Sequence, residues 1–308
     1  MFNGSSHNNR VDSNHLTRAI SYSIYSEGDS QTITNNRIEH SKGQGLYLQG
    51  ADTCLVSGNQ VYSTWYSMQL DLTNARNNRI INNVFDSSVG TSVSLDWNSM
   101  GNVFDSNTVT RSRGYALYVL GDSNTFVSNR VEQAVTYGFR LWYADSCYLA
   151  GNSVRNVLGN PMAAGISVYE AKGNRLYNNT IDSCQYANIR LESSGASNNT
   201  FDSNMVTNST GNGLDLYGAT GIVISGNYVA GNKLQGMRLF DLTGVQITGN
   251  RIFNNTYDGI MLGSNQGRVY NNLLAGNGNK QIELTSGYTN CFVDSNTIRD
   301  GSNSGIYV

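Results

Sequence analysis

The chain has 308 residues, of which 20 are Lys or Arg and 22 are Asp or Glu, so its formal net charge is −2. This balance excludes a strongly basic nucleic-acid surface, and no apolar run approaches the roughly 18 residues that a membrane-spanning helix needs. The chain also has 42 Asn, 33 Gly and a single Pro, which favours many short strands joined by tight turns over long helices.

A repeat of about 23 residues begins near the N-terminus and continues along the whole chain. Its most regular feature is an Asn followed two residues later by an apolar residue, with successive copies 22 to 27 residues apart. Because these Asn recur at the same turn, we expect their amides to form a ladder in which each side chain bonds the next. The ladder positions are Asn14, Asn36, Asn59, Asn83, Asn107, Asn129, Asn152, Asn179, Asn204, Asn227, Asn250, Asn272 and Asn296. A second structural column is expected at Asn78, Asn102, Asn124, Asn174 and Asn199.

Each repeat also contains a small residue followed by an apolar-x-apolar strand, as at 45–48, 138–141, 165–168, 213–216, 236–239, 259–262 and 305–308. One repeat cannot bury its apolar face alone, whereas stacked repeats can, with each strand pairing in parallel with its copy. The prediction is an all-β, single-stranded, right-handed parallel β-helix of about 13 coils with three parallel sheets. A two-sheet sandwich is the weaker alternative, since its strands would not keep so regular a period. We expect one domain over residues 1–308 that lacks its native end caps, so that flanking domains or oligomer contacts cover the ends.

The pattern G-I-x-L, a short polar turn and N-x-x-x-x-N-x-I resembles the repeat of the right-handed parallel β-helix family. This family includes mannuronan epimerases, polysaccharide lyases and NosD-type periplasmic proteins, and the resemblance covers essentially the whole chain. It implies that the G-I-x-L strands form the first sheet, that a polysaccharide lies along this sheet, and that the protein is extracellular, at the cell surface or periplasmic. The Asp-Pro-His signature of the epimerases is absent, because Pro161 is the only proline.

Alternation along the G-I-x-L strands predicts which side chains point outward. The middle outward column is expected to contain Ser23, Tyr47, Gln69, Ser94, Tyr118, Arg140, Ser167, Arg190, Asp215, Arg238, Met261, Glu283 and Tyr307. The next column is expected to contain Tyr25, Gln49, Asp71, Asp96, Leu120, Trp142, Tyr169, Glu192, Tyr217, Phe240, Gly263 and Thr285. Aromatic rings stack on sugar faces, and Arg and carboxylates bind hydroxyls and charged groups. The predicted substrate-binding residues are Trp97, Trp142, Tyr143, Tyr169, Glu170, Arg190, Glu192, Asp215, Tyr217, Arg238, Phe240 and Asp241. The alternative is a ladder of stabilising cross-strand pairs, such as Arg190 with Asp215.

An insertion at 156–163 precedes the strand at 165–168 and lengthens that repeat. We expect it to bulge beside the outward face near Trp142, Tyr169 and Arg190, since functional residues favour irregular loops on a rigid scaffold. A concave groove walled by this loop would favour an enzyme, whereas a flat face would favour a scaffold.

Two catalytic chemistries are compatible with the outward residues. Proton abstraction from a uronate, as in lyases and epimerases, needs an acid–base group and a cation for the substrate carboxylate. Tyr118 beside Arg140 is predicted to supply them, with Tyr115, Tyr137 and Arg113 nearby in the sequence. Glycoside hydrolysis needs paired carboxylates, for which Asp71 and Asp96 on adjacent coils, or the diagonal pair Glu192 and Asp215, are candidates.

No cofactor is expected. Single Asp residues on separate coils could bind Ca²⁺, but no spacing demands it, and no Met, His or Cys cluster suits copper. Cys54, Cys147, Cys184 and Cys291 are predicted to be buried thiols. The sequence favours binding and modification of an acidic polysaccharide by a lyase- or epimerase-like protein. The alternatives are a non-catalytic structural or adhesive β-helix, such as a surface fibre or a tailspike-like stalk, and a glycoside hydrolase.

Overall fold

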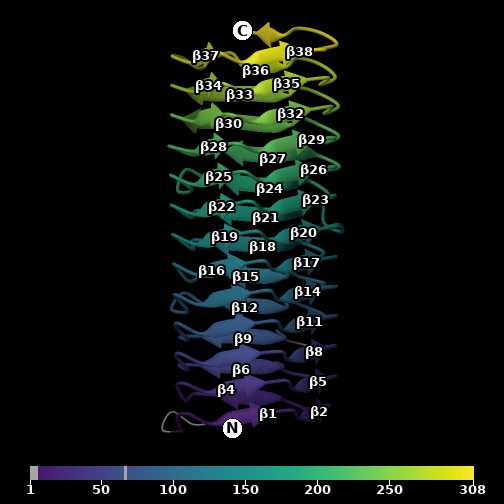
Figure 1. Cartoon of the computed structure of the whole chain (residues 1–308), viewed down its shortest axis with the longest axis vertical. Helices are drawn as coiled ribbons and strands as arrows, with labels where there is room; N and C mark the ends of the chain where they lie inside the picture. Colours follow the sequence, from purple (N-terminus) through teal and green to yellow (C-terminus); the bar gives the residue numbers. More distant parts are fainter. Residues whose placement is uncertain (1–5, 66–67) are drawn as a thin grey trace. The chain divides into compact units, whose positions relative to one another are not determined.

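The computed structural model describes residues 6–65 and 68–308. Short strands dominate these residues, which contain no helix and therefore none that could cross a membrane. The strands belong to three parallel sheets, each built from every third strand along the chain (Figure 1). The predicted fold class, an all-β solenoid of about 13 turns with three parallel sheets, is confirmed. The chain divides into two compact units, Met1–Ser153 (unit 1) and Val154–Val308 (unit 2).

Unit 1 contains six or seven strands of each sheet among its described residues. Sheet A holds the G-I-x-L strands β3 (Ile24–Ser26), β6 (Leu46–Gln49), β9 (Leu70–Thr73), β12 (Val93–Leu95), β15 (Leu117–Val119) and β18 (Tyr137–Trp142). Sheet B holds β1 (Arg10–Asp12), β4 (Thr32–Thr34), β7 (Leu55–Ser57), β10 (Arg79–Ile81), β13 (Val103–Asp105), β16 (Thr125–Val127) and β19 (Tyr148–Ala150). Sheet C holds β2 (His15–Thr17), β5 (Arg37–Glu39), β8 (Gln60–Tyr62), β11 (Val84–Asp86), β14 (Thr108–Thr110) and β17 (Arg130–Glu132).

Unit 2 repeats this order, with sheet A strands that are mostly twice as long as those of the other sheets. Sheet A holds β21 (Ala164–Tyr169), β24 (Ala187–Glu192), β27 (Asn212–Tyr217), β30 (Met237–Thr243), β33 (Ile260–Asn265), β36 (Ile282–Leu284) and β39 (Ile306–Tyr307). Sheet B holds β22 (Arg175–Tyr177), β25 (Thr200–Asp202), β28 (Val223–Ser225), β31 (Gln246–Thr248), β34 (Arg268–Tyr270) and β37 (Phe292–Asp294). Sheet C holds β23 (Thr180–Asp182), β26 (Met205–Thr207), β29 (Tyr228–Ala230), β32 (Arg251–Phe253), β35 (Leu273–Ala275) and β38 (Thr297–Arg299), and β20 (Ser153–Arg155) spans the unit boundary in the sequence.

The predicted Asn ladder is present in both units. Asn107 illustrates it: its Nδ2 donates to Asn129 Oδ1 at 3.0 Å and to the Ile80 carbonyl at 2.8 Å. Its Oδ1 accepts from the backbone N and the side-chain Nδ2 of Asn83 at 2.9 and 3.0 Å. Each ladder Asn thus satisfies polar groups at an inward-facing bend, where an unbonded amide would be costly.

The second predicted column is also confirmed, since Asn78 Nδ2 donates to Asn102 Oδ1 at 3.0 Å. A third ladder, which the sequence analysis did not identify, joins Asn232 to Asn255 and Asn255 to Asn277 at the turn between sheets C and A of unit 2. All three ladders lie at turns, so the outward faces of the sheets are left to other functions.

The cysteines fill ladder and core positions. Cys54 occupies a position of the second Asn column: its backbone N–H donates to Oδ1 of Asn78 on the next coil, at 2.7 Å. Cys54, Cys147 and Cys184 are buried as predicted, and burial raises the pKa of these thiols to about 11, 12 and 12, respectively. Cys291 is only half-buried, which corrects the prediction for this residue.

Candidate functional site

The strand register places the outward residues of sheet A and corrects the predicted positions on two coils of unit 1, those of Ser23 and Tyr25 and those of Gln69 and Asp71. Tyr47 pairs with Asp71, and Asp71 with Ser94, so Asp71 occupies the middle column and not the next one. Tyr25 likewise pairs with Tyr47, the position assigned to Ser23. Gln69 is buried, and its Nε2 donates to the carbonyls of Val61 and Asp86. Asp71 and Asp96 are therefore not neighbours in one column, as the paired-carboxylate hypothesis assumed.

In unit 2 the register agrees with the predicted middle column throughout and with the next column from Tyr169 to Phe240, after which a β-bulge between Leu239 and Leu242 shifts the pairing. The two columns enclose a small pocket. Arg190 pairs with Asp215 and Asp215 with Arg238 in one column, while Glu192 pairs with Tyr217 and Tyr217 with Phe240 in the next. The pocket has a volume of about 140 Å³ and is lined by Tyr186, Arg190, Leu191, Glu192, Asp215, Tyr217 and Arg238. Five of these residues were predicted as substrate-binding, and the register of β24, β27 and β30 brings them together.

Two ion pairs organise this pocket. Arg238 Nη1 lies 2.8 Å from Asp215 Oδ1, and Arg190 Nη2 lies 2.6 Å from Glu192 Oε2. These two ion pairs differ from the predicted alternative, in which Arg190 pairs directly with Asp215. Arg190 and Asp215 are only 7% and 5% exposed, so both charges depend on their partners for compensation.

Tyr186 completes the pocket and was missed by the sequence analysis. The Arg190 guanidinium lies 4.8 Å from the centre of its ring. Burial, followed by the hydrogen bond to the Asp215 carboxylate, raises the pKa of Tyr186, so its hydroxyl is protonated at neutral pH and acts as a donor. A signal was present: Tyr115 lies two residues before the sheet A strand β15, and Tyr137 begins the sheet A strand β18.

The exposed rim of the pocket is aromatic. The Tyr217 ring is 48% exposed and stacks on Phe240, with centroids 6.0 Å apart and planes inclined by 8°. Tyr169 ends β21 opposite Glu192 and is half-buried. Glu170 and Asp241 have left-handed backbone conformations, with φ of 50° and 55°, and Glu170 Oε1 accepts a bond from the Ser193 hydroxyl.

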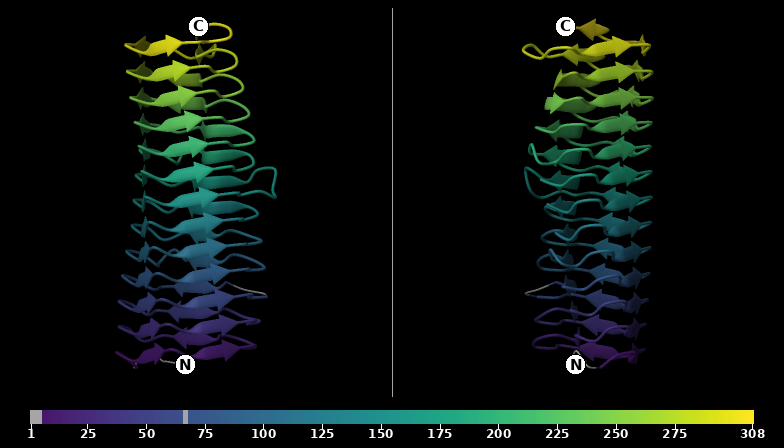
Figure 2. Two further views of the ribbon diagram at one scale, coloured as in Figure 1. Left: turned by 45° about the vertical axis from the view of Figure 1, so that its right-hand side comes forward. Right: turned by 90° about the vertical axis from the view of Figure 1, so that its left-hand side faces the viewer.

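The insertion 156–163 connects β20 to β21 and extends beyond the neighbouring turns as the teal loop in Figure 2. It reaches the pocket's edge, because Tyr186 N donates to the Ala163 carbonyl at 2.9 Å and Gly159 N to Gln185 Oε1 at 2.8 Å. None of the loop's residues is among those that line the pocket. The loop therefore positions Tyr186 and does not wall a deep groove in the described part of unit 2.

Unit 1 carries an aromatic cluster on sheet A around Arg140. Tyr118 pairs with Arg140 in the register, and the Arg140 guanidinium lies 4.7 Å from the Tyr137 ring centre and 4.9 Å from that of Trp142. Tyr115 stacks on Tyr118 with centroids 5.0 Å apart. Arg140 is only 4% exposed, so Trp142 and Tyr137 cover the cation that was predicted to meet a substrate carboxylate. Burial and the neighbouring Tyr115 raise the pKa of Tyr118, and Arg140 offsets this only in part.

The other predicted residues of unit 1 lie at the edges of this cluster. Trp97 is 53% exposed, and its ring lies 5.5 Å from that of Tyr143. Asp96 Oδ1 accepts bonds from Asn74 N, Asn98 N and the Ser99 hydroxyl at 3.0, 3.2 and 2.7 Å, which fixes the turn after β12. Burial, together with the charge of Asp96, raises the pKa of Asp71 against the opposing bond from Gln44.

The described residues contain no group of three or more His, Cys, Asp or Glu side chains that could hold a metal ion. The buried thiols are protonated at neutral pH, and His15 is already bonded to Glu39 at 2.9 Å on an exposed strand. Soft thiolate or imidazole ligands, which copper prefers, are therefore not gathered anywhere in the described part of the chain.

Two family models match the sequence. A model of right-handed β-helix regions matches residues 1–154, and the model of the periplasmic copper-binding protein NosD matches residues 100–307. The chain belongs to the NosD family and to the right-handed β-helix proteins. The family's description as copper-binding does not fit the donor set of the described residues. A search of curated proteins finds no significant match.

Several solved structures share the fold at low sequence identity. A mutant of the periplasmic alginate epimerase AlgG is 12% identical, with a TM-score of 0.67 over 89% of this chain and 78% of that chain. The Dettilon tailspike protein is 15% identical, with a TM-score of 0.66 over 90% and 62% of the two chains. A mutant tailspike of E. coli bacteriophage HK620, in complex with a pentasaccharide, is 11% identical, with a TM-score of 0.57 over 97% and 70%. At these identities the likeness shows the fold alone.

Proposed function

We propose that the chain binds an acidic polysaccharide along the outer face of sheet A. The observation that carries this proposal is the pocket of unit 2, in which two Arg–carboxylate pairs lie beside the exposed Tyr217 ring. Aromatic rings stack on the apolar faces of sugars, and oriented Arg and carboxylate groups donate to and accept from hydroxyls. The alginate epimerase and tailspike structures support the choice of ligand class only through their shared fold.

Each pocket residue is proposed to contact a different part of the ligand. Tyr217 offers its exposed face to a sugar ring, with Phe240 supporting it from the adjacent strand. The Asp215–Arg238 pair accepts from one sugar hydroxyl and donates to its neighbour, and the Tyr186 hydroxyl, whose proton is donated to Asp215, can accept a third bond. A uronate carboxylate would bind Arg190 by taking the place of Glu192, whose side chain is more exposed than that of Arg190.

The aromatic cluster of unit 1 is proposed as a separate binding surface, on the sheet A strands of that unit. Trp97 and Tyr143 present exposed rings that suit stacking. Trp142 and Tyr118 pack around Arg140, which we therefore assign to positioning these rings, because direct contact of Arg140 with ligand would require Trp142 to move.

Modification of the bound polymer is a second candidate function, favoured by the raised pKa of Asp71. A carboxyl group that stays protonated above its usual range can serve as a general acid, and Tyr118 lies two strand spacings away, about 10 Å, in the same column. In a lyase reaction the ionised form of Asp71, made more basic by the same raised pKa, would take the C5 proton of a uronate while the C4–O bond breaks and the protonated Tyr118 donates its proton to the departing oxygen. Hydrolysis by Asp71 and Asp96 is less well supported, because the Asp96 carboxylate already accepts hydrogen bonds from Asn74 N and the Ser99 hydroxyl.

A non-catalytic structural or adhesive β-helix is the competing function from another class. The closed ion pairs of the pocket support it, since such pairs also stabilise neighbouring strands without any ligand. We place the protein outside the cytoplasm, in the periplasm or beyond, because the NosD family and AlgG are both described as periplasmic.

Titration calorimetry tests the binding proposal with oligouronates and a neutral oligosaccharide of equal length. Tyr217→Ala is expected to lower affinity about tenfold, the effect of losing a stacking contact. Tyr257→Ala is the matched control, because both rings are 48% exposed and Tyr257 lies outside the pocket. Equal losses in the two variants, or no binding by the parent chain, would reject the proposal.

The catalytic candidate is tested separately by incubating the chain with uronate polymers. Unsaturated products would appear as ultraviolet absorbance, and inversion at a sugar carbon would change the anomeric proton signals. If the chain is an enzyme of this type, Tyr118→Phe removes turnover and leaves affinity within a few-fold of the parent. Binding without any turnover would leave the non-catalytic function as the better account.

A further inference from the structure

A second site lies on unit 1, at the turns that lead from sheet C to sheet A. Five successive turns have a left-handed residue at the same position, namely Arg18, His40, Ser63, Ser87 and Arg111. The three-residue segments that start there, 18–20, 40–42, 63–65, 87–89 and 111–113, contain Arg18, His40, Lys42, Arg111 and Arg113 and no acidic residue. We call this surface the basic corner. Its charge contrasts with the formal net charge of −2 of the whole chain.

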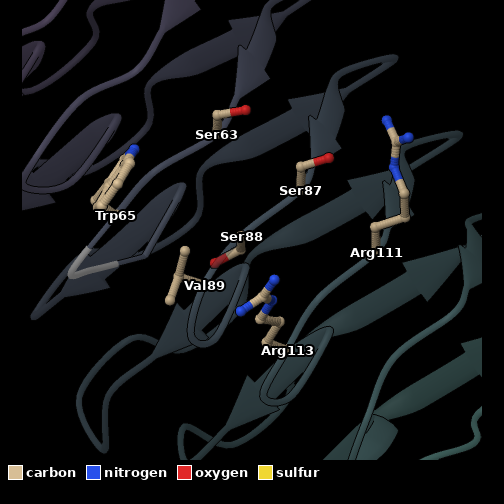
Figure 3. A pocket seen from close by; sticks show the side chains of 7 residues that line it. All are labelled: Ser63, Trp65, Ser87, Ser88, Val89, Arg111 and Arg113. Carbon is tan, nitrogen blue, oxygen red and sulfur yellow. The ribbon is translucent and has the colours of Figure 1, made fainter.

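The basic corner contains a pocket of about 490 Å³, lined by Ser63, Trp65, Ser87, Ser88, Val89, Arg111 and Arg113 (Figure 3). Trp65 and Val89 are 59% and 47% exposed, so an indole face and an aliphatic side chain are open to a ligand. Figure 3 shows the Arg113 guanidinium next to Val89 and Ser88, with Trp65 beyond Val89 in this view. Exposed rings combined with hydroxyls and guanidinium groups are typical of a site for a sugar.

The two arginines of the pocket differ in what they can bind. Arg111 Nε donates to Asp86 Oδ1 at 2.8 Å, its Nη2 bonds Asp86 Oδ2, and Asp86 is only 7% exposed. Burial alone would raise the pKa of Asp86, but the bonds from Arg111 and Thr110 hold it below the usual value. Arg113 forms no ion pair with any carboxylate in the described part of the chain and is exposed. The positive charge available to a ligand is therefore that of Arg113.

We propose that this pocket binds an acidic saccharide, with its carboxylate or sulfate group on Arg113 and a sugar ring on Trp65. The hydroxyls of Ser63 and Ser87 lie on the same surface and can bond sugar hydroxyls. The other basic groups of the corner, Arg18 and Lys42, continue the positive surface toward the N-terminal coils. This site shares no residue with the sheet A face, so it stands whether or not that face binds a polysaccharide.

Fluorescence can isolate this pocket, because the chain has only three Trp. In the double variant Trp97→Phe/Trp142→Phe, Trp65 is the sole indole and its emission reports ligands at the basic corner alone. The probes are an oligogalacturonate, a sulfated oligosaccharide, a neutral oligosaccharide of equal length and sodium sulfate. We expect the two acidic saccharides to change the emission with saturation, and the neutral saccharide to need at least tenfold higher concentration. An equal response to sodium sulfate at the same concentrations would overturn the assignment of a sugar ligand.

Variants that remove one positive charge, made in the same double-variant background, test the role of Arg113. Arg113→Gln is expected to lower the affinity for the acidic saccharides about tenfold, the effect of losing one charge-assisted contact. The control Arg79→Gln on sheet B is expected to change this affinity by no more than about twofold. Tyr217→Ala is expected to leave the Trp65 response unchanged, which separates this site from the pocket of unit 2. An equal loss in Arg113→Gln and Arg79→Gln, or no change of Trp65 emission with any acidic saccharide, would overturn the proposal.

Discussion

Trp142 is the residue whose replacement distinguishes a binding role from a packing role most clearly. Its ring is half-buried, lies 4.9 Å from the Arg140 guanidinium and meets Tyr118 edge-on at 6.2 Å. Trp142→Ala is therefore expected to reduce stability as well as affinity. This differs from the expectation for a solvent-facing ring, whose removal would affect ligand binding alone.

The expected loss can be estimated from the two contacts. A partly desolvated cation–π contact contributes about 1–2 kcal/mol, and an edge-to-face aromatic pair about 0.5–1.5 kcal/mol beyond buried area. Because the ring is only half-buried, the total loss in the free energy of unfolding is expected to be about 2–3 kcal/mol, below the value for a fully buried Trp. Trp97→Ala is the matched control: Trp97 is 53% exposed and touches Tyr143, so its loss should stay below about 1 kcal/mol.

Urea denaturation followed by far-ultraviolet circular dichroism measures both variants against the parent chain. Denaturation midpoints are compared, since a solenoid need not unfold in a single two-state step. Calorimetric titration with an oligouronate then compares affinities. If Trp142→Ala kept the parent's midpoint while Trp97→Ala lowered it, the assignment of Trp142 to the packing around Arg140 would be refuted.

Three further predictions concern the ladder, the buried acid and the thiols. Asn107→Ala leaves several buried partners unbonded and is expected to lower stability by about 3 kcal/mol in urea denaturation, whereas the exposed Asn98→Ala changes it by less than about 0.5 kcal/mol. Because burial and the charge of Asp96 raise the pKa of Asp71 above 3.8, ionised Asp71 destabilises the folded chain at neutral pH. Asp71→Asn should therefore raise the midpoint at neutral pH, and this gain should vanish below pH 3.8, where the acid is protonated in both states. A thiol reagent at neutral pH is expected to modify Cys291 alone in the folded chain, as intact-mass spectrometry would show; rapid modification of a second thiol would contradict the burial of the other three.

The fold could be predicted from the sequence because the ladder Asn and the apolar strand positions carry redundant information. Every copy of the Asn falls at the same bend, and that bend is where an amide is needed to satisfy inward-facing backbone groups. The same repetition makes the strand register predictable wherever a clear G-I-x-L motif is present. Around Gln69 the motif is weak, and a polar side chain is buried there because its amide bonds two carbonyls, so simple alternation assigned the neighbouring columns wrongly.

The candidate site was predictable as a set of residues but not as a geometry. Arg190, Asp215 and Arg238 follow from the register, yet their choice of partners depends on side-chain rotamers that no pattern encodes. Arg190 pairs with Glu192 on its own strand, and Asp215 pairs with Arg238 on the next. The covering of Arg140 by Tyr137 and Trp142 likewise arises from packing across and along strands. Tyr186 was missed because it precedes the strand whose alternation was analysed.

The charges of the two proposed sites imply different responses to salt. The pocket of unit 2 contains two arginines and two carboxylates, so it is formally neutral and would exert little long-range attraction on an acidic polymer. Its preference for uronates would come from short-range exchange of Glu192 for a ligand carboxylate at Arg190, and such buried contacts are screened only weakly. The basic corner has exposed cations, so its affinity should fall steeply as ionic strength rises. Titrating the Trp65 reporter and the pocket of unit 2 at low and high salt separates the two mechanisms, because equal salt dependence at both sites is inconsistent with these charge distributions.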